Sequence, residues 1–301
     1  MKKEIVVGTR GSRLAIRQTE IALEELKSVF PDLTFRIKII KTIGDTIWDK
    51  PLFEIGGKGF FIKEIEEALL SRNIDMAIHS MKDVPTELKK GLTIAAILKR
   101  EDPRDAFVSF DFQNLDELPD GSKIGTSSFR RSAQLLGLGK RLYVVPIRGN
   151  VETRIKKIKT EKLSGVILAY CGLKRLGLES YAKWIIPPET IVPSAGQGAI
   201  GIEVREDSEL LDILEKINDE QTSREVELER KIQMLIGGGC HVPFGVNVES
   251  KDSFFILHAF YGSRDGRIFV KIKEKGTWSS LDDFTINVLK KLKSPPEGAE
   301  Y

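Results

Sequence analysis

A single cysteine near the end of the chain has the surroundings best suited to chemistry. Cys240 follows three consecutive glycines, Gly237 to Gly239, at the end of a long charged stretch. Glycines carry no side chain and leave the backbone free, so a large molecule could approach the sulfur or be attached to it. The alternative is a glycine-rich helix end that happens to contain a cysteine. This segment alone leaves both interpretations open.

A second candidate is the pair Lys82 and Asp83, which comes shortly after the apolar segment Asp75 to Ile78. A carboxylate beside a positive charge is held ionised and can transfer a proton or stabilise a cation. The alternative is a simple turn before Pro85. His79, just ahead of the pair, is more typical of a packed, hydrogen-bonded histidine than of a catalyst.

Two segments repeat one arrangement in different parts of the chain. Gly8 to Ala15 and Gly125 to Ala133 each follow a predicted strand, begin a helix, and contain hydroxyl groups and arginine. Free N–H groups and the helix dipole at such a position favour an anion, and arginine adds a bidentate contact to a carboxylate. The alternative is ordinary capping with solvated arginines. Their occurrence at matching places favours two anion sites facing a cleft between two lobes.

More basic groups follow further strands of the second lobe. Arg148 and Arg154 bracket the start of a helix, and Arg175 follows the strand before Tyr170. Ligands of open α/β sheets bind at the carboxyl ends of strands, and planar guanidinium groups suit carboxylates. The sequence therefore predicts a polyanionic ligand, although a solvated surface role stays open for Arg175. Gly56 to Gly59, which contains Lys58, is typical of a glycine hinge and lacks the Walker spacing.

The elements that must position these residues alternate between strand and helix patterns. In the first lobe we predict strands at Glu4 to Val7, Arg36 to Ile40, Asp75 to His79 and Leu92 to Leu98, and helices at Arg13 to Phe30 and Phe60 to Arg72. In the second we predict strands at Lys123 to Gly125, Leu142 to Pro146 and Val166 to Ala169. The remainder predicts a helix over 208–236, strands at Phe244 to Val248, Phe254 to Phe260 and Ile268 to Ile272, and a last helix at Leu281 to Leu292. The pattern is α/β in two lobes, followed by a smaller α+β domain from about residue 219.

Composition limits the classes of protein. The chain has 301 residues, 41% of them hydrophobic, and shows neither a secretion signal nor an apolar run of membrane-spanning length. Two cysteines and three histidines support neither a disulfide framework nor a zinc site. The net charge of +3 comes from 47 basic and 44 acidic residues mixed along the chain, so no basic face for nucleic acid is indicated. We expect a cytoplasmic protein with reduced thiols.

Taken together and in order, these segments resemble one family, the hydroxymethylbilane synthases or porphobilinogen deaminases of tetrapyrrole biosynthesis. The resemblance covers nearly the whole chain. It rests on Gly8 to Ser12, Gly56 to Gly59, His79 to Pro85, Gly125 to Arg131, Arg148 to Val151, Gly172 to Gly177, Gly196 to Ala199, Glu229-Arg230 and Gly238 to Pro243.

The resemblance implies an α/β fold with two lobes similar to type II periplasmic binding proteins and a smaller C-terminal α+β domain. The implied boundaries are 1–98 with 199–217 for domain 1, 99–198 for domain 2 and 218–301 for domain 3. Cys240 would hold a dipyrromethane cofactor through a thioether. Four porphobilinogen molecules would be added to it, each with loss of ammonia, before hydrolysis releases hydroxymethylbilane. A cytoplasmic monomer without nucleic-acid or membrane partners is implied.

Asp83 is then the expected catalytic residue, because loss of ammonia leaves an azafulvenium cation that needs a nearby carboxylate. The acetate and propionate groups of the pyrroles account for the binding residues. These are Arg10, Ser12, Gln18, Lys58, Phe61, Ser80, Lys82, Thr126, Ser127, Ser128, Arg130, Arg131, Arg148, Arg154, Arg175 and Gln197. We expect these arginines to be uncompensated and to repel one another, so that the protein without cofactor is the less stable form.

Residues 42–58 resemble the family's active-site lid, which would exclude water from a reactive cation. Three places depart from the pattern of the family: Tyr170 with Cys171, His241 and Phe129. Of these, Cys171 lacks flanking glycines and is interpreted as a small packed residue.

Two other classes of protein would share some of these features. A non-catalytic carboxylate-binding protein would have the lobes and arginines but no use for Cys240. A nucleic-acid binder would show a basic face and binding that weakens steeply with salt.

Overall fold

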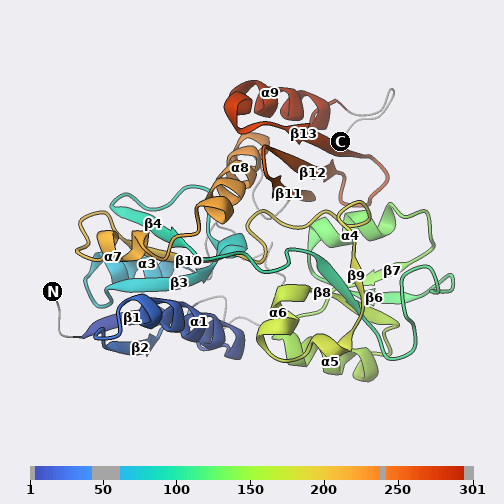
Figure 1. The fold of residues 1–301 in the computed structure, drawn as a ribbon. Helices are drawn as coiled ribbons and strands as arrows, with labels where there is room; N and C mark the ends of the chain where they lie inside the picture. Colours follow the sequence, from blue (N-terminus) through green and yellow to red (C-terminus); the bar gives the residue numbers. More distant parts are fainter. Residues whose placement is uncertain (1–3, 43–61, 238–241, 295–301) are drawn as a thin grey trace. The chain divides into compact units, whose positions relative to one another are not determined.

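The computed structural model describes residues 4–42, 62–237 and 242–294. It contains two compact units (Figure 1). Unit 1 comprises the chain up to Glu101 together with Gly198–Arg224, and unit 2 comprises Asp102–Gln197 together with the chain from Glu225 onward. The described strands form two five-stranded sheets and one three-stranded sheet.

Unit 1 is built on a sheet in the order β2-β1-β3-β10-β4. Its strands are β1 (Ile5–Thr9), β2 (Phe35–Ile39), β3 (Met76–Ser80), β4 (Leu92–Ile97) and β10 (Ile200–Arg205). The chain after Gly198 therefore returns to the first sheet, where β10 runs antiparallel between β3 and β4. Strand β3 is buried at four of its five residues, which explains its nearly continuous apolar sequence.

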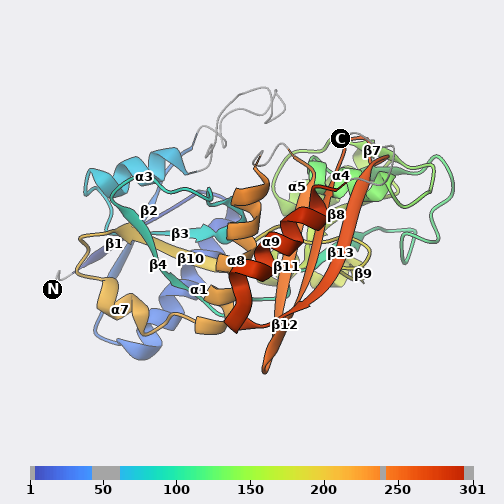
Figure 2. The ribbon, with the colours of Figure 1, turned by 90° about the horizontal axis from the view of Figure 1, so that it is seen from above.

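Helices cover both faces of this sheet, and a hydrophobic core lies on each face. Helices α1 (Arg13–Val29) and α7 (Leu211–Glu215) pack on one face, and α3 (Lys63–Leu70) packs on the other (Figure 2). The Ser12 side chain caps α1.

Unit 2 repeats the arrangement in the order β7-β6-β8-β5-β9. Its strands are β5 (Asp105–Val108), β6 (Lys123–Gly125), β7 (Tyr143–Val145), β8 (Gly165–Ala169) and β9 (Ala182–Ile186). Helix α4 (Phe129–Leu136) packs on one face, while α5 (Val151–Thr160) and α6 (Tyr170–Arg175) pack on the other (Figure 1).

The two sheets match strand for strand. In each, the second-last strand of the order, β10 or β5, is antiparallel to its neighbours. Consequently β1 with α1 corresponds to β6 with α4, and the segment after β3 corresponds to the segment after β8. The repeated sequence segments at 8–15 and 125–133 therefore occupy equivalent places in two folds of the same topology.

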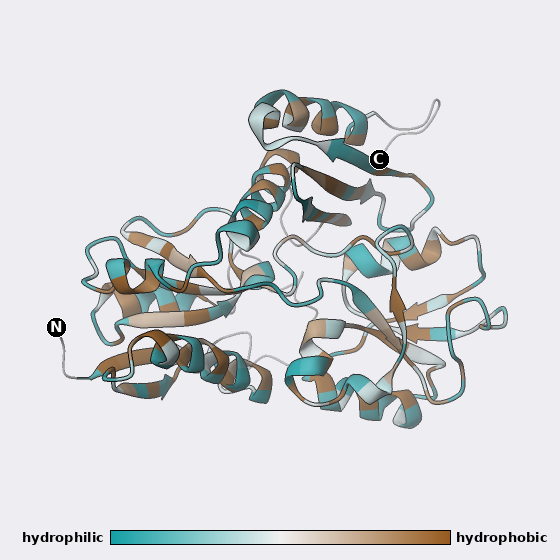
Figure 3. Ribbon diagram, viewed as in Figure 1, coloured by the Kyte–Doolittle hydropathy of each residue, from teal (hydrophilic) through white to brown (hydrophobic). Residues whose placement is uncertain are grey.

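The C-terminal part of unit 2 is an antiparallel sheet of β11 (Phe244–Lys251), β12 (Phe254–Gly262) and β13 (Phe269–Gly276). Residues of α8 (Glu220–Ile236) and α9 (Leu281–Leu292) bury one face of it. Both helices alternate hydrophobic and hydrophilic residues along their length (Figure 3).

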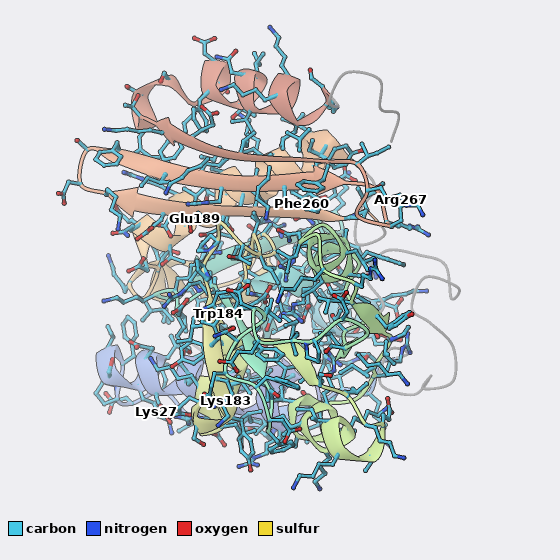
Figure 4. All side chains as sticks on the ribbon, turned by 90° about the vertical axis from the view of Figure 1, so that its right-hand side faces the viewer. Lys27, Lys183, Trp184, Glu189, Phe260 and Arg267 are labelled. Atoms are coloured by element: carbon cyan, nitrogen blue, oxygen red, sulfur yellow. The ribbon has the colours of Figure 1, made fainter. Side chains whose placement is uncertain are left out.

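The other face of this sheet meets the rest of unit 2. Phe260 packs there against Ala133 and Val192, and Lys273 Nζ lies 2.8 Å from Glu189 Oε1. Figure 4 shows Glu189 and Phe260 at this junction. The three-stranded sheet is thus fastened to the α4 side of the five-stranded sheet.

Most predicted strands and helices are present within a few residues, but one prediction was wrong. The stretch 208–236 is not one helix, because it breaks between α7 and α8. Asn218 Oδ1 accepts a hydrogen bond from Ile97 N, and Asp219 N donates to Ile97 O, so this segment is fastened to the end of β4 instead. The division into three domains stays a prediction.

Candidate functional site

In unit 1, candidate residues gather where β1 and β3 end. Arg10 is half-buried directly after β1, and Ser12 Oγ accepts a hydrogen bond from Ala15 N at 3.2 Å. Gln18, one turn and a half into α1, is buried and its Nε2 donates to Ser80 Oγ at 2.6 Å. The structure therefore brings Gln18 and Ser80 together, which spacing in the sequence did not indicate.

The segment after β3 forms one turn of 3-10 helix, Met81–Asp83. Met81 points into the core, Lys82 is half-buried and Asp83 is exposed. Asp83 makes no hydrogen bond or ion pair with any residue that the structure describes. The carboxylate is thus free to interact with a ligand at the carboxyl end of the sheet.

In unit 2, the matching segment lies between β6 and α4. Ser128 caps α4, accepting from Arg131 N, and Thr126 Oγ1 accepts from Ser128 N. Ser127 is exposed, and its Oγ donates to Ile147 O at 2.6 Å. These bonds hold a helix N-terminus in place beside the end of the sheet, where it attracts an anion.

Arg130 and Arg131 are both about 94% buried, and they share one carboxylate. Arg130 Nη1 donates to Asp105 Oδ2 and Arg131 Nη2 to Asp105 Oδ1, each at 2.7 Å. Gln197 Nε2 donates to the same Oδ1 at 2.8 Å. We call these four side chains the Asp105 cluster.

The charges of the Asp105 cluster follow from burial and pairing. Burial alone would raise the pKa of Asp105, but Arg130 and Arg131 hold it well below its usual range. Burial lowers the pKa of Arg130, with Asp105 opposing and Arg131 adding to that effect. With all three groups ionised the cluster carries one excess positive charge, and Arg131 Nε is buried without a hydrogen-bond partner among the described residues.

This cluster corrects one expectation and supplies a residue that the sequence interpretation missed. Arg130 and Arg131 were expected to be uncompensated, yet Asp105 compensates one of their two charges. Asp105 could have been noticed as an acid at the head of the apolar strand Asp105-Ala106-Phe107-Val108, since a carboxylate buried there needs a cation. Its position follows from the sheet, because β5 is antiparallel and Asp105 pairs with Ala169 at the end of β8.

The remaining candidate arginines of unit 2 lie after β7 and β8. Arg148 is half-buried; Arg154 Nε donates to Gly149 O at 2.7 Å, close to the Asn150 cap of α5. Arg175, in α6, is buried. Unit 2 thus places its cationic candidates along the strand ends of one sheet.

Three predicted site residues lie outside the described part of the chain: Lys58, Phe61 and Cys240, as do residues 43–58 of the predicted lid. The second cysteine, Cys171, is buried and forms no disulfide, in agreement with its interpretation as a packed residue. Within the described ranges, no cluster of acidic, cysteine and histidine side chains could hold a metal ion. Nor is any helix described there both long and apolar enough to cross a bilayer.

Taken unit by unit, the described candidates suit different tasks. Unit 1 offers an exposed carboxylate and an amine on one turn, and unit 2 offers guanidinium groups and a capped helix N-terminus. Carboxylates fit the second set in charge and geometry, whereas the first set is suited to proton transfer and to stabilising a cation.

Comparisons with known proteins agree with this description. Residues 5–212 match the family model described as "Porphobilinogen deaminase, dipyromethane cofactor binding domain". The chain is 47% identical over 275 residues to the porphobilinogen deaminase of Alkaliphilus metalliredigens, covering 91% of this chain and 87% of that protein. It is 45% identical over 280 residues to that of Listeria monocytogenes, covering 92% and 91%.

Among solved structures, a putative methionine-binding lipoprotein from Bacillus subtilis aligns with a TM-score of 0.46 at 15% identity, over 74% of this chain and 93% of that one.

Proposed function

The chain belongs to the porphobilinogen deaminase family, and on that premise we propose how its residues carry out the reaction. The protein is a transferase of tetrapyrrole biosynthesis, a hydroxymethylbilane synthase, and its cofactor is dipyrromethane. The expected fold class, α/β with two binding-protein-like lobes and a C-terminal α+β part, is confirmed. The assignment of individual residues is the proposal.

The described residues fit a dipyrromethane bearing acetate and propionate groups. The observation that carries this fit is the row of arginines at the strand ends of unit 2, with one excess positive charge in the Asp105 cluster. When bound, the dipyrromethane supplies the pyrrole carbon to which the first porphobilinogen is joined. Strand ends that carried neutral or acidic side chains would not have bound the acetate and propionate groups of dipyrromethane.

Asp83 is the proposed catalytic residue. Its exposed carboxylate can accept a hydrogen bond from a pyrrole N–H, stabilise the cation left when ammonia departs, and accept the proton released from the carbon that forms the new bond. Lys82, its neighbour, would contact a substrate carboxylate. Because Asp83 makes no hydrogen bond or ion pair with the residues that the structure describes, its carboxylate is available for all of these steps.

The other proposed binding residues act on carboxylates. Arg10 and Ser12 would do so at the start of α1, and Thr126 to Ser128 at the start of α4. Further contacts are proposed for Arg130, Arg131, Arg148, Arg154, Arg175, Gln18, Ser80 and Gln197. Gln18 donates a hydrogen bond to Ser80 and Gln197 donates one to Asp105, which supports a role for both in holding other residues of the set in place.

Cys240 is proposed as the tether that holds the cofactor through a thioether, with no chemical role during turnover. Lys58 and Phe61 are proposed at the base of a lid formed by residues 42–58. These assignments rest on the sequence.

An intact mass tests the tether. Protein purified from a host that makes porphobilinogen should exceed its sequence mass by one dipyrromethane, and Cys240→Ser should remove that excess. Cys171→Ser, a change of the buried free cysteine, is the matched control and should keep it. Active protein with an unmodified Cys240 would refute the proposal and favour a non-covalent ligand.

Turnover tests the catalytic carboxylate. Asp83→Asn should lower kcat for porphobilinogen at least about 100-fold, the scale of general acid–base catalysis. Asp111→Asn replaces an exposed aspartate of unit 2 and should leave kcat unchanged. Normal turnover by Asp83→Asn would assign the proton transfer to another group.

We further propose that the protein is a cytoplasmic monomer that binds neither nucleic acid nor membranes. Light scattering of the purified protein tests the oligomeric state, since a mass near 33.8 kDa is expected.

A further inference from the structure

A buried pair of ionisable groups lies near the end of β3, the strand that leads into the turn carrying Asp83. His79 Nε2 and Glu203 Oε2 are 2.9 Å apart, and their side chains are 4% and 0% exposed. His79 is the fourth residue of β3 and Glu203 the fourth of β10. The proposed reaction assigns no role to either residue.

The register of the two strands explains how the pair forms. Strand β10 is antiparallel to β3, with His79 opposite Gly201 and Ala77 opposite Glu203. His79 and Glu203 are thus diagonal neighbours on one face of the sheet, within reach of a long side chain. This hydrogen bond links the two strands where β3 approaches its end.

Gly201 connects the same place to the catalytic turn. A Cβ atom at position 201 would lie 2.1 Å from Met81 Sδ, so any larger residue would force the Met81 side chain out of its present position. Met81 is the first residue of the turn and is 1% exposed, and its backbone N donates to Ala199 O at 3.1 Å. The start of the turn is therefore held by the backbone of Ala199, just before β10, and by the Met81 side chain, which packs beside Gly201 of β10.

Asp83 depends on these contacts for its position. Its carboxylate makes no hydrogen bond or ion pair with the residues that the structure describes, so the backbone of the turn sets where it points. That backbone is fixed by Met81 and by Ser80, whose Oγ accepts the hydrogen bond from Gln18. A shift of β3 against β10 would therefore move the turn and the Asp83 carboxylate with it.

The pair is costly to bury, which makes a packing role alone a poor explanation. Glu203 Oε1 is buried without a hydrogen-bond partner in the described ranges. Glu203 also acts on Glu66 of α3. Burial raises the pKa of Glu66 and the charge of Glu203 raises it further, whereas Lys89, with Nζ 3.3 Å from Glu66 Oε2, lowers it. An apolar pair of similar size would leave no buried polar atom without a hydrogen-bond partner.

We propose that His79 and Glu203 are positioning residues for Asp83. Their hydrogen bond fixes the end of β3 against β10, and Gly201 seats Met81 so that the turn presents the Asp83 carboxylate in one orientation. The inference rests on the catalytic role proposed for Asp83.

The test is steady-state kinetics per cofactor-loaded molecule, with loading measured by intact mass. Glu203→Ala and His79→Ala should each lower kcat about 10- to 100-fold while KM for porphobilinogen changes less than about twofold, because misplacement of about 1 Å has effects of this size. Glu203→Gln keeps a hydrogen-bond acceptor of the same shape and should recover most of the lost kcat. A role in stability alone would lower the melting temperature of all three and leave kcat of the folded, loaded protein unchanged, which would overturn the inference.

A control and a second variant keep the test decisive. His258, another buried histidine near a glutamate, lies on β12, and His258→Asn should keep kcat. Gly201→Ala should lower kcat with unchanged KM even if the alanine variants of the pair do not fold; unchanged kcat in Gly201→Ala would count against positioning through Met81.

Asp83→Asn is measured beside them. If it is inactive while His79→Ala and Glu203→Ala keep full kcat, only this inference fails. If Asp83→Asn is itself fully active, the proposed function of Asp83 fails instead.

Discussion

Arg131 and Asp105 form a buried ion pair, with Nη2 and Oδ1 2.7 Å apart and Arg130 bound to the other carboxylate oxygen. Two consecutive arginines on one helix would repel each other if nothing lay between them. Asp105 separates and orients them, and Arg130 Nη1 also donates to Val192 O. The pair therefore links the proposed binding residues to the framework of unit 2.

Asp105→Asn should be strongly destabilising, because it leaves two buried guanidinium groups without their counter-charge. We expect the free energy of unfolding to fall by about 3–5 kcal/mol, as when one partner of a buried ion pair is removed. Urea denaturation measures it. Asp120→Asn, which removes an exposed partner of Arg141, is the control and should leave the midpoint unchanged. Equal midpoints for wild type and Asp105→Asn would mean that the arginines find other partners.

The stabilisation by Asp105 should depend on pH in a defined direction. Its pKa is lower in the folded protein than in the unfolded chain, where it is about 4. The unfolded chain therefore binds the proton more readily, so the contribution is complete above about pH 4 and is lost as the pH falls from there toward the folded pKa. Thermal melts from pH 7 to pH 2.5 should show wild type and Asp105→Asn converging only below about pH 4. A difference that shrinks near pH 6 would point to another group.

Features that depend on local sequence could be predicted, whereas contacts between residues far apart in the chain could not. Strand β3 and the repeated helix starts carry local patterns, apolar runs and caps, that short segments reveal. The bonds of the Asp105 cluster join residues 25 to 92 positions apart, and the bond of His79 to Glu203 joins residues 124 positions apart. Such contacts exist only once β5 and β10 insert into their sheets. The break between α7 and α8 was missed for the same reason, since it depends on bonds to Ile97 in β4.

Gly198 should tolerate no side chain. Its φ is +94°, and a Cβ atom would lie 2.3 Å from Glu101 O, a backbone atom that cannot easily move. Gly139 has a φ of +75° with nothing within 4 Å, so Gly139→Ala should cost only the strain of the left-handed conformation, about 1 kcal/mol. Gly198→Ala should lower the free energy of unfolding clearly further, as measured by urea denaturation. Equal losses in the two variants would show that Glu101 can shift.

Glu229 should be essential to the C-terminal sheet of unit 2. Its carboxylate is fully buried and accepts hydrogen bonds from Gly196 N and Val248 N, both at 2.7 Å. Glu229→Gln turns an acceptor into a donor facing an N–H group, and we expect a loss of about 2–3 kcal/mol. Glu227→Gln, an exposed change on the same helix, should have no measurable effect on the thermal midpoint. The prediction fails if Glu229→Gln and Glu227→Gln both have the thermal midpoint of the wild type.

The protein without cofactor should be less stable than the loaded form, although by less than a site of wholly uncompensated arginines would require. Asp105 neutralises one of the two charges of Arg130 and Arg131, which leaves one excess positive charge buried with them. Carboxylates of the bound cofactor would offset that charge, and binding only to the folded state stabilises it. Thermal melts of loaded wild type and of unloaded Cys240→Ser should therefore differ, with the loaded form higher. Because added salt screens repulsion between the partly exposed arginines, the difference should narrow as salt rises. Equal melting temperatures at low salt would show that the arginines are already compensated within the protein.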